Sequence, residues 1–314
     1  MKRDTDRERA VVLDRIVKRY GETTALAGLS LEVKRGEMFG LIGPDGAGKT
    51  TAIRLMCGLL HPDSGELRVL GLNPVRAHRA LTERVGYLSQ RFSLYGDLTI
   101  DENIAFFAEI HGVGRYAAAR DRLLDMTQLT PFRDRRADRL SGGMKQKLAL
   151  ACTLVHEPRL LLLDEPTTGV DPVSRREFWK LLSEFRSRGL TIVMATPYLD
   201  EAERCARVAL LHEGRLLAIA APIDLQERLG GQILEVIVDI PRPPIDVLAR
   251  APGVVDVQSF GDRAHVRIGR GDAERAAGAV TAALREAGVP VVSVRPVAAS
   301  LEDVFIDLIT ESTK

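Results

Sequence analysis

The sequence lacks the cysteine and histidine patterns that mark disulfide-rich and metal-binding proteins. Its 314 residues include three cysteines, Cys57, Cys152 and Cys205, which are far apart and lie in apolar, helix-like surroundings. We expect these thiols to be small buried hydrophobic groups of a protein in a reducing compartment, because metal ligation needs a paired spacing. The six histidines form no close i, i+4 pair, so we assign no metal to them.

A dominant charge and a long apolar run are also missing. Lysine and arginine number 44 against 43 aspartate and glutamate, a net charge of +1, and this balance argues against a nucleic-acid partner. No apolar run approaches the roughly 20 residues needed to cross a bilayer, so we expect no membrane-spanning helix in this chain. The opening MKRDTDRERA is too charged for a secretory signal.

The order of apolar and turn segments indicates two domains of unequal size. Strands alternate with helices over residues 1–230, which predicts an α/β domain with a largely parallel sheet and, at its start, an antiparallel pair of strands turning at Gly21. Residues from about 91 to 157 predict a helical subdomain. Residues 231–314 follow the order strand, helix, two strands, helix, strand, which predicts a small βαββαβ, ferredoxin-like α+β domain.

Several helix starts carry capping signals. Ser141 precedes one helix, Asp171 precedes another that opens with proline, and residues 99–102, TIDE, form a capping-box pattern. After the apolar strand TIVMAT we expect Thr196 to be the N-cap of a helix whose first residue is Pro197, because the fixed φ of proline suits that position.

A phosphate-binding loop is the most specific motif. GPDGAGKT lies between an apolar strand and a helix and fits the pattern of glycine, four residues, glycine, lysine, then serine or threonine. Converging backbone amides and the helix N-terminus predict a site for nucleotide phosphates. Lys49 is expected to reach the β and γ phosphates, Thr50 to bind Mg²⁺, and Thr51 to bind the α phosphate. The residues predicted to contact the nucleotide here are Gly43, Pro44, Asp45, Gly46, Ala47, Gly48, Lys49, Thr50 and Thr51.

Two adjacent carboxylates, Asp164 and Glu165, end the apolar run LLLLDE. A buried strand that ends beside the phosphate loop predicts Asp164 near the metal and Glu165 near the γ phosphate, where it can orient or deprotonate the attacking water. The alternative is that both carboxylates cap a helix before Pro166. Because the phosphate loop lies upstream, we favour the catalytic interpretation.

The segment LSGGMKQKLALA predicts a second anion site. Ser141, Gly142 and Gly143 offer a hydroxyl and unobstructed backbone amides at the start of a helix. One chain seldom needs two phosphate sites for one nucleotide. With these motifs the sequence resembles the ATP-binding cassette (ABC) family over residues 10–225, and the resemblance implies that LSGG covers the γ phosphate bound by a second, head-to-tail subunit.

The resemblance also assigns three residues whose local sequence says little. It implies that Tyr20 stacks on adenine, that Gln90 contacts Mg²⁺ and the attacking water, and that Asp171 communicates across the dimer. Its implied cofactors are ATP and Mg²⁺. The implied fold is a P-loop NTPase with a mixed sheet core, an antiparallel β subdomain and a helical subdomain. The purely structural alternatives are that Tyr20 packs in an edge strand and that Asp171 caps a helix.

One position departs from the family. After TIVMAT the family places a histidine that contacts the γ phosphate, and this chain has Pro197. Proline has no hydrogen-bond donor in its side chain or backbone. Loss of one oriented donor to a transition state commonly costs about 100-fold to 1000-fold in rate. Slow turnover is therefore one expectation, and we still favour hydrolysis because the other motifs are intact.

The chain resembles the drug-resistance branch of ABC exporters through YLDEAERC, SLEDVFIDL and its small C-terminal domain. This branch implies a second, identical ATPase subunit and a separate transmembrane permease, with the chain cytoplasmic and held at the inner face of the membrane by that permease. Phe92, Leu94, Tyr95, Phe106 and Phe107 are candidates for permease contact, and core packing is their alternative. The alternative functions are a nucleotide-gated regulatory subunit with little hydrolysis and a soluble ABC ATPase without a transport partner.

Overall fold

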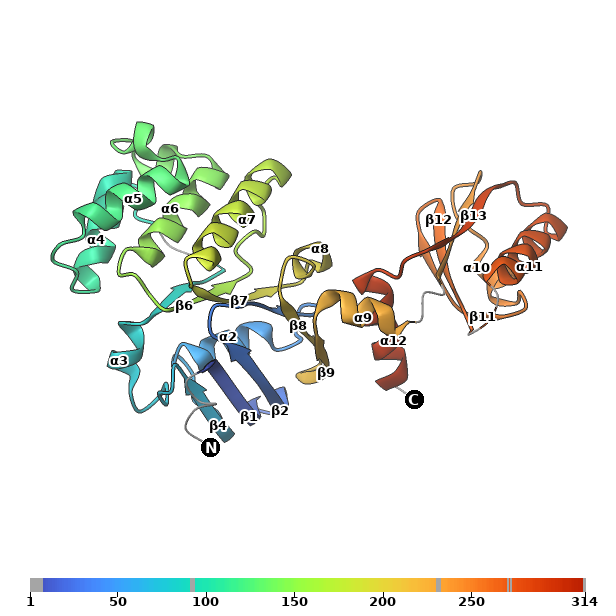
Figure 1. Ribbon diagram of the computed structural model, residues 1–314, viewed down its shortest axis with the longest axis horizontal. Helices are drawn as coiled ribbons and strands as arrows, with labels where there is room; N and C mark the ends of the chain where they lie inside the picture. The colour runs from blue at the N-terminus through green and yellow to red at the C-terminus, as the bar shows by residue number, and fades with distance from the viewer. Residues whose placement is uncertain (1–7, 91–93, 230–232, 270, 272, 313–314) are drawn as a thin grey trace. The chain divides into compact units, whose positions relative to one another are not determined.

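The computed structural model describes the chain except for residues 1–7, 91–93, 230–232, 270, 272 and 313–314 (Figure 1). Two compact units divide it, Met1–Ile219 and Ala220–Lys314. The boundary that we predict after residue 230 lies about one short helix further along the chain. That helix, α9 (Pro222–Arg228), belongs to the second unit because it packs against the last helix, α12 (Leu301–Ser312).

The first unit begins with an antiparallel sheet in the order β2-β1-β4. β1 (Arg9–Tyr20) and β2 (Thr23–Lys34) form the predicted hairpin, and Gly21 turns it with a φ of +58°, a left-handed conformation that glycine adopts without strain. β4 (Ser64–Val69) pairs with the other edge of β1.

The central sheet follows in the order β5-β6-β7-β3-β8-β9, and its first five strands run parallel. Every residue of β3, β6 and β7 is buried, as expected for parallel strands covered on both faces. The strands are β3 (Met38–Ile42), β5 (Val85–Leu88), β6 (Leu160–Asp164), β7 (Thr191–Thr196), β8 (Arg207–His212) and β9 (Arg215–Ala220). Alternate residues of these strands join α2 (Lys49–Met56) and the antiparallel sheet in one hydrophobic core.

Helices account for the rest of the first unit. The helical subdomain packs α4 (Ile100–Ile110) and α5 (Ala117–Thr127) against α6 (Gly142–Leu154). The short elements are α3 (His78–Thr82), η1 (Thr130–Phe132), η2 (Ala137–Arg139) and α8 (Leu199–Ala202), and α7 (Pro172–Ser187) is the longest helix of this unit. The three cysteines are buried free thiols, as predicted, and burial raises the pKa of Cys205 to about 12.

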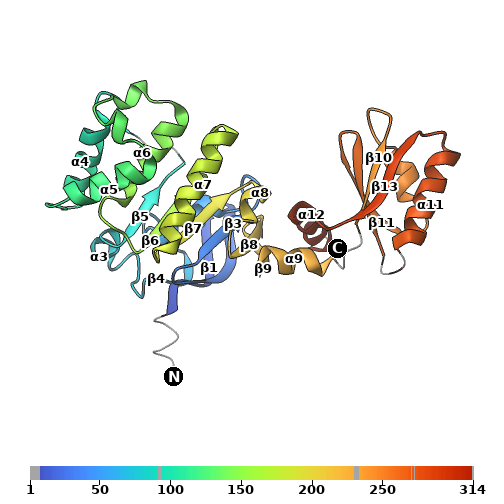
Figure 2. The same ribbon diagram turned by 45° about the horizontal axis from the view of Figure 1, so that its top comes forward.

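The second unit has the predicted βαββαβ order. Its sheet runs β11-β12-β10-β13 with every pair antiparallel, which is the ferredoxin-like arrangement. Figure 2 shows α11 along one face of this sheet, where Val280 and Leu284 join the core. The elements between α9 and α12 are β10 (Ile233–Val238), α10 (Ile245–Ala249), β11 (Val254–Phe260), β12 (Arg263–Ile268), α11 (Ala273–Glu286) and β13 (Val291–Val297). Across the described residues of both units, no helix combines the length and hydropathy required to cross a membrane.

Candidate nucleotide-binding site

The phosphate loop joins the end of β3 to the start of α2. Gly46 and Gly48 have φ values of +80° and +97°, and a Cβ on Gly48 would lie 2.5 Å from the carbonyl oxygen of Ala25. A Cβ on Gly43 would lie 2.2 Å from the carbonyl oxygen of Leu211. Gly48 is the N-cap of α2 and offers no side chain, so the first amides of this helix remain available to an anion.

Lys49 is buried at the floor of this loop. Its Nζ donates hydrogen bonds to the carbonyl oxygens of Gly43 at 2.8 Å and Pro44 at 3.0 Å. The same Nζ lies 3.4 Å from Oε1 of Glu165, and both side chains are less than 10% exposed. The lysine therefore holds the loop in shape and places a positive charge where phosphates would lie.

Asp164, the last residue of β6, faces Thr50. Oδ1 of Asp164 accepts a hydrogen bond from the Thr50 hydroxyl at 2.8 Å. Its other oxygen, Oδ2, is buried and has no hydrogen-bond partner among the described residues. Burial raises the pKa of this carboxyl, and the Thr50 hydrogen bond opposes that rise. A carboxylate oxygen left without a partner beside a hydroxyl suits a hard divalent cation, so these two residues fit Mg²⁺.

Glu165 adopts a strained backbone conformation, with a φ of +50° that non-glycine residues rarely show. Its N–H donates to the carbonyl oxygen of Ala195 at 2.9 Å. Oε2 accepts a hydrogen bond from Gln90 Nε2 at 3.0 Å and one from Thr168 Oγ1 at 3.4 Å. Gln90 and Glu165, which are 75 residues apart in the sequence, are thus brought together beside Lys49. Such strain is common at functional sites.

Lys49, Thr50, Gln90 and Glu165 line one cleft of about 640 Å³. Tyr20 also lines it and is 46% exposed, with Lys18 Nζ 5.7 Å from its ring centroid. Stacking of Tyr20 on adenine stays a prediction. Thr23, Thr24, Ala25 and Glu213 also line the cleft, although nothing in their local sequence marked them. The lining residues are Tyr20, Thr23, Thr24, Ala25, Asp45, Gly46, Ala47, Gly48, Lys49, Thr50, Thr51, Gln90, Glu165 and Glu213.

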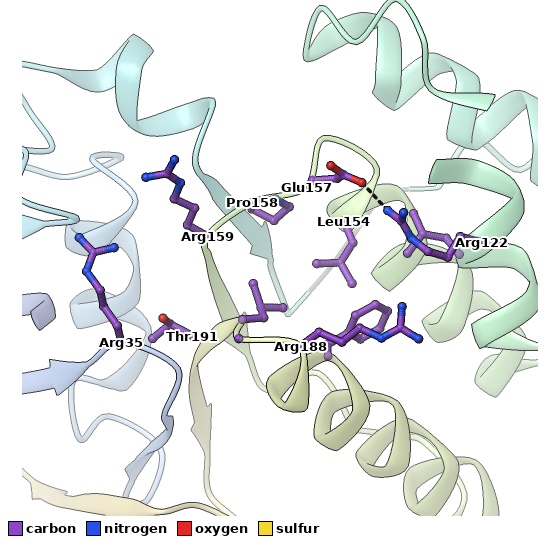
Figure 3. A pocket seen from close by; sticks show the side chains of 12 residues that line it. Arg35, Arg122, Leu154, Glu157, Pro158, Arg159, Arg188 and Thr191 are labelled. Atoms are coloured by element: carbon purple, nitrogen blue, oxygen red, sulfur yellow. Dashed lines mark hydrogen bonds and ion pairs between the residues drawn. The ribbon is translucent and has the colours of Figure 1, made fainter. Parts of the chain in front are cut away.

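A second cavity, of about 510 Å³, lies at the other end of the parallel strands (Figure 3). Arg35 and Arg159 lie on one side of it, and Arg122 and Arg188 lie on the other. Arg159 and Thr191 place it at the amino ends of β6 and β7. Nucleotide sites of α/β sheets lie at the carboxyl ends of strands, and none of the phosphate-loop residues lines this cavity, so we assign the nucleotide to the cleft beside Lys49.

Seven predicted site residues are absent from the lining of the nucleotide cleft. Gly43 and Pro44 accept hydrogen bonds from Lys49, and Asp164 accepts one from Thr50, so these three lie directly beside the lining residues. The other four lie at the starts of α6 and α7: Ser141, Gly142, Gly143 and Asp171. Ser141 is the N-cap of α6, and Asp171 is the N-cap of α7, as predicted. Hydrogen bonds from the first turn of α7 lower the pKa of Asp171. Gly143 is closely packed, because a Cβ there would lie 2.6 Å from Ser174 Cβ.

The expected helix start at Pro197 is wrong. Helix α8 begins at Leu199, and its N-cap is Tyr198, whose side chain makes no capping bond. Thr196 instead accepts the Tyr198 N–H at 3.1 Å and donates its own hydroxyl to Glu201 Oε2 at 2.7 Å. A buried carboxylate thus engages the hydroxyl that we expected to cap the helix. Pro197 lies in a bend before the helix and has no N–H to donate.

The buried lysine, the paired carboxylates and the glycine loop define a P-loop nucleotide-binding protein. Comparison with known proteins narrows this class. Residues 26–168 match the family described as "ABC transporter", and residues 222–309 match "ATP-binding protein DrrA1-3-like, C-terminal domain". The chain therefore belongs to the ATP-binding proteins of ABC transporters, in the group with a DrrA-like C-terminal domain. ABC cassettes of this family bind ATP and are ATPases coupled to transport.

Individual relatives agree with this assignment. The chain is 47% identical over 226 residues to the probable multidrug ABC transporter ATP-binding protein YbhF of Escherichia coli K12, a match that covers 71% of this chain and 39% of YbhF. It is 37% identical over 313 residues to the daunorubicin resistance ATP-binding protein DrrA2 of Streptomyces coeruleorubidus, covering 97% of this chain and 96% of DrrA2. The dimeric structure of the bacterial ABC transporter cassette MJ0796 superposes with a TM-score of 0.59 at 26% identity, covering 67% of this chain and 98% of that one.

Proposed function

We propose that this chain is the ATP-hydrolysing subunit of a multisubunit ABC exporter. In this proposal two copies close head-to-tail around two Mg-ATP and drive a separate transmembrane permease. The observation that carries it is the arrangement at the end of β6. Asp164 keeps one oxygen without a partner beside Thr50, and Glu165 lies between Lys49 and Gln90.

In this proposal different residues of the cleft bind the phosphates, hold the metal and activate the water. Lys49 and the amides at the start of α2 would bind the β and γ phosphates, and Thr51 the α phosphate. Thr50, Asp164 and Gln90 would hold Mg²⁺, which when bound neutralises charge on the phosphate oxygens. Glu165 is the group that orients the attacking water and accepts its proton.

The proposed dimer is supported by the position of the second predicted anion site. Ser141 and the two glycines after it do not line the cleft of their own chain. Ser141 and Gly142 are exposed at the N-terminus of α6, and Gly143 is buried. A second copy would bring this helix start to the γ phosphate, where its amides favour an anion. Asp171 would lie at the same interface. The dimeric form of the MJ0796 cassette supports this arrangement, and identical copies are the simplest way to form it.

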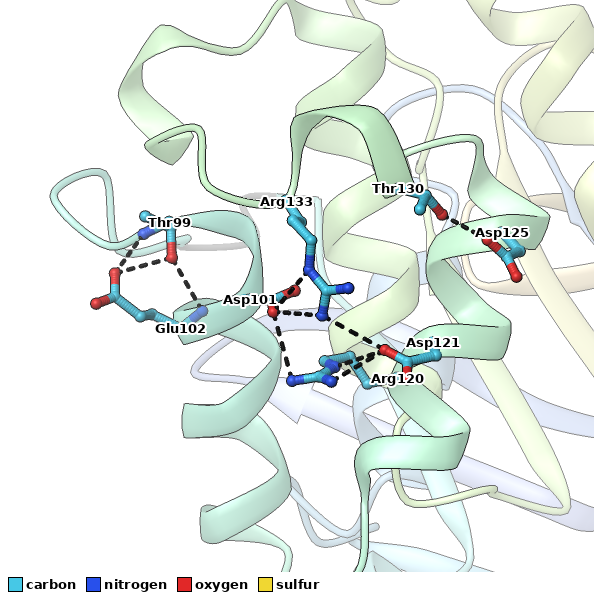
Figure 4. Close-up of polar contacts among 8 residues, drawn as sticks. All are labelled: Thr99, Asp101, Glu102, Arg120, Asp121, Asp125, Thr130 and Arg133. Atoms are coloured by element: carbon cyan, nitrogen blue, oxygen red, sulfur yellow. Dashed lines mark hydrogen bonds and ion pairs between the residues drawn. The ribbon is translucent and has the colours of Figure 1, made fainter.

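The helical subdomain is the proposed contact with the permease. Arg133 binds Asp101 of α4 at 2.7 and 3.0 Å and lies 3.4 Å from Asp121 of α5, so the two helices are cross-linked (Figure 4). Arg120 of α5 also lies 3.4 Å from Asp101. We expect these hydrogen bonds and ion pairs to hold α4 and α5 together, so that the subdomain moves as a rigid body. We expect the permease to hold the chain at the inner face of the membrane.

Aromatic side chains at the start of this subdomain are the expected docking points. Tyr95 is 46% exposed and packs edge-on against Phe106, which in turn packs against Phe107. Leu94 is part-buried, so it contributes less surface to a partner. Phe92, which we also expect to contact the permease, lies outside the described residues. The daunorubicin resistance and multidrug names of the relatives support export, and the identity of the cargo depends on the permease.

A regulatory subunit with little hydrolysis is the second candidate. It is favoured by Pro197, because no hydrogen-bond donor is available at the position where the family has its histidine. Binding of ATP and closure of the dimer would then carry the signal without fast turnover. The two candidates differ in kcat and agree in ATP-dependent dimerisation.

The Glu165→Gln variant tests the proposal. This change keeps the side-chain shape and the nucleotide site but removes the base, so Mg-ATP should trap a stable dimer. We expect its mass, measured by size exclusion with light scattering, to double when saturating Mg-ATP is added. With ADP the variant should remain a monomer. A variant that stays monomeric under saturating Mg-ATP would contradict the proposed head-to-tail dimer.

A further inference from the structure

Glu201 places its carboxylate in an enclosed polar cluster behind the nucleotide cleft. Its side chain is 1% exposed. Oε1 accepts hydrogen bonds from Thr167 Oγ1 at 2.5 Å and Trp179 Nε1 at 3.4 Å, and Oε2 accepts one from Thr196 Oγ1 at 2.7 Å. Arg175 Nε lies 3.8 Å from Oε1 and adds a positive charge. Three hydrogen-bond donors and one guanidinium therefore converge on one carboxylate.

Two of these donors come from the segments that form the catalytic centre. Thr167 lies two residues after Glu165, and Thr196 is the last residue of β7. The backbone N–H of Glu165 also donates to the carbonyl oxygen of Ala195. The segment after β6 and the segment after β7 are thus joined twice, once through the backbone and once through the side chain of Glu201.

The third donor, Trp179, and the ion-pair partner, Arg175, come from helix α7. Arg175 and Trp179 lie in its first half, and the N–H of Arg175 donates to the carbonyl oxygen of Asp171, the N-cap residue. The Arg175 guanidinium also lies 4.7 Å from the ring centroid of Tyr198. The carboxylate therefore connects the Asp171 turn, which is expected at the dimer interface, with the segment around Pro197.

A buried carboxylate is a costly choice for packing alone, because an apolar side chain of similar volume usually serves stability as well or better. This one also lies outside the nucleotide cleft, so it does not bind ATP directly. We propose that Glu201 is a positioning residue for hydrolysis: it holds the Glu165 segment, the Pro197 segment and the start of α7 in register. This inference rests on the proposed ATPase function and adds a residue to it.

The test compares four variants of the full chain with a matched control. Glu201→Ala removes the shared acceptor, and Thr167→Val and Thr196→Val each remove one donor with little change of volume. Glu201→Gln keeps an amide oxygen that can still accept from Thr167 and Trp179. The control is Thr153→Val, because its buried hydroxyl bonds only within α6, to the carbonyl oxygen of Ala149.

We expect Glu201→Ala, Thr167→Val and Thr196→Val to lower kcat for ATP by about tenfold to 100-fold, since small misplacements at a reacting centre have effects of this size. KM should change by less than about threefold, because Glu201 is not among the residues that line the nucleotide cleft. Glu201→Gln should retain more activity than Glu201→Ala, and Thr153→Val should match the wild type. The double variant Thr167→Val with Thr196→Val should lose less than the product of the two single losses, because both donors share one acceptor.

A second measurement does not depend on hydrolysis. In the nucleotide-free chain, Glu201→Ala should speed amide hydrogen exchange at Glu165 and Tyr198, while Thr153→Val should leave both rates unchanged. A wild-type chain without ATPase activity would refute the proposed function, and unchanged exchange in Glu201→Ala would refute the positioning role. Folded variants with wild-type kcat would also overturn the inference. If Glu201→Ala does not fold, the two threonine variants decide.

Discussion

The carboxylates beside the nucleotide cleft and the most buried carboxylates of the second unit have different kinds of partner. In the first unit Asp164 leaves one buried oxygen without a partner among the described residues, and the adjacent Glu165 holds a left-handed backbone. In the second unit the most buried carboxylates, Asp303 and Glu235, are each engaged by a basic side chain. Asp303 binds His265 at 2.9 Å, and Glu235 binds Arg295 at 2.7 Å.

This difference separates groups held ready for a ligand from groups that hold a fold. An unpaired buried oxygen and a strained residue reduce stability, and they persist where a ligand or a reaction uses them. Paired carboxylates instead join elements of the second unit, since His265 and Arg267 of β12 bind Asp303 and Asp307 of α12. Substitutions of Asp164 and Glu165 should therefore change chemistry more than stability, and substitutions of Asp303 and Glu235 should do the reverse.

The largest effect is expected for Glu165→Gln. Loss of the general base should lower kcat by about 100-fold to 10,000-fold while the free energy of unfolding stays near that of the wild type. Steady-state release of phosphate at saturating Mg-ATP measures the rate, and urea unfolding measures stability. Glu157→Gln is the control, because that exposed glutamate lies near the amino ends of the parallel strands and does not line the nucleotide cleft. A wild-type rate in Glu165→Gln would remove this residue from the mechanism.

Asp164→Asn should act through the metal. The amide is a weaker ligand for a hard cation, so we expect the Mg²⁺ concentration that gives half-maximal ATPase activity to rise about tenfold to 100-fold. Titration of Mg²⁺ at fixed ATP measures this shift. Relief of a buried, unpartnered charge should leave the free chain as stable as the wild type or more so. An unchanged Mg²⁺ requirement would show that Asp164 does not hold the metal.

Pro197→His should raise the ATPase rate, by about tenfold, because it restores a donor toward the γ phosphate. The rate per subunit at saturating Mg-ATP measures the effect. The control Pro222→His places the same side chain at the start of α9 in the second unit and should leave the rate unchanged. No increase in Pro197→His would show that this position does not limit turnover.

The smallest expected effect lies in the second unit. The hydrogen bond to Asp303 raises the pKa of His265 above its usual value, and burial opposes part of the rise. A raised pKa stabilises the fold most below about pH 6.5, and this contribution is lost as the pH rises through the folded-state value. His265→Gln should therefore lower stability by no more than about 1 kcal/mol at pH 5.5 and by less at pH 8.5. Exchange of the β12 amides at the two pH values measures it.

The control for that comparison is ATPase activity. His265→Gln should leave kcat at the wild-type value at both pH values, because the second unit contributes no residue to the cleft. Equal destabilisation at pH 5.5 and pH 8.5 would show that the pair with Asp303 does not depend on protonation of His265.

Local features of this chain were readable from the sequence because they act within one turn or loop. Glycine at positions 46 and 48 permits left-handed backbone, Asp171 bonds the amides of its own helix, and the two-residue turn at Gly21 joins adjacent strands. The order of strands and helices also predicted both folds. Thr196 shows where local reasoning fails, because its hydroxyl binds a carboxylate five residues later instead of capping the next helix.

By itself, therefore, the sequence determined the phosphate loop, the helix caps at Ser141 and Asp171, the order of elements and the resemblance to ABC proteins. Only the tertiary structure decided which residues meet. It brought Thr50 to Asp164 across 114 residues and Gln90 to Glu165 across 75, and it buried Glu201 among donors from three segments. The physical reason is that a parallel sheet aligns the ends of strands that are distant in the chain, and side chains at those ends interact only after the sheet has formed.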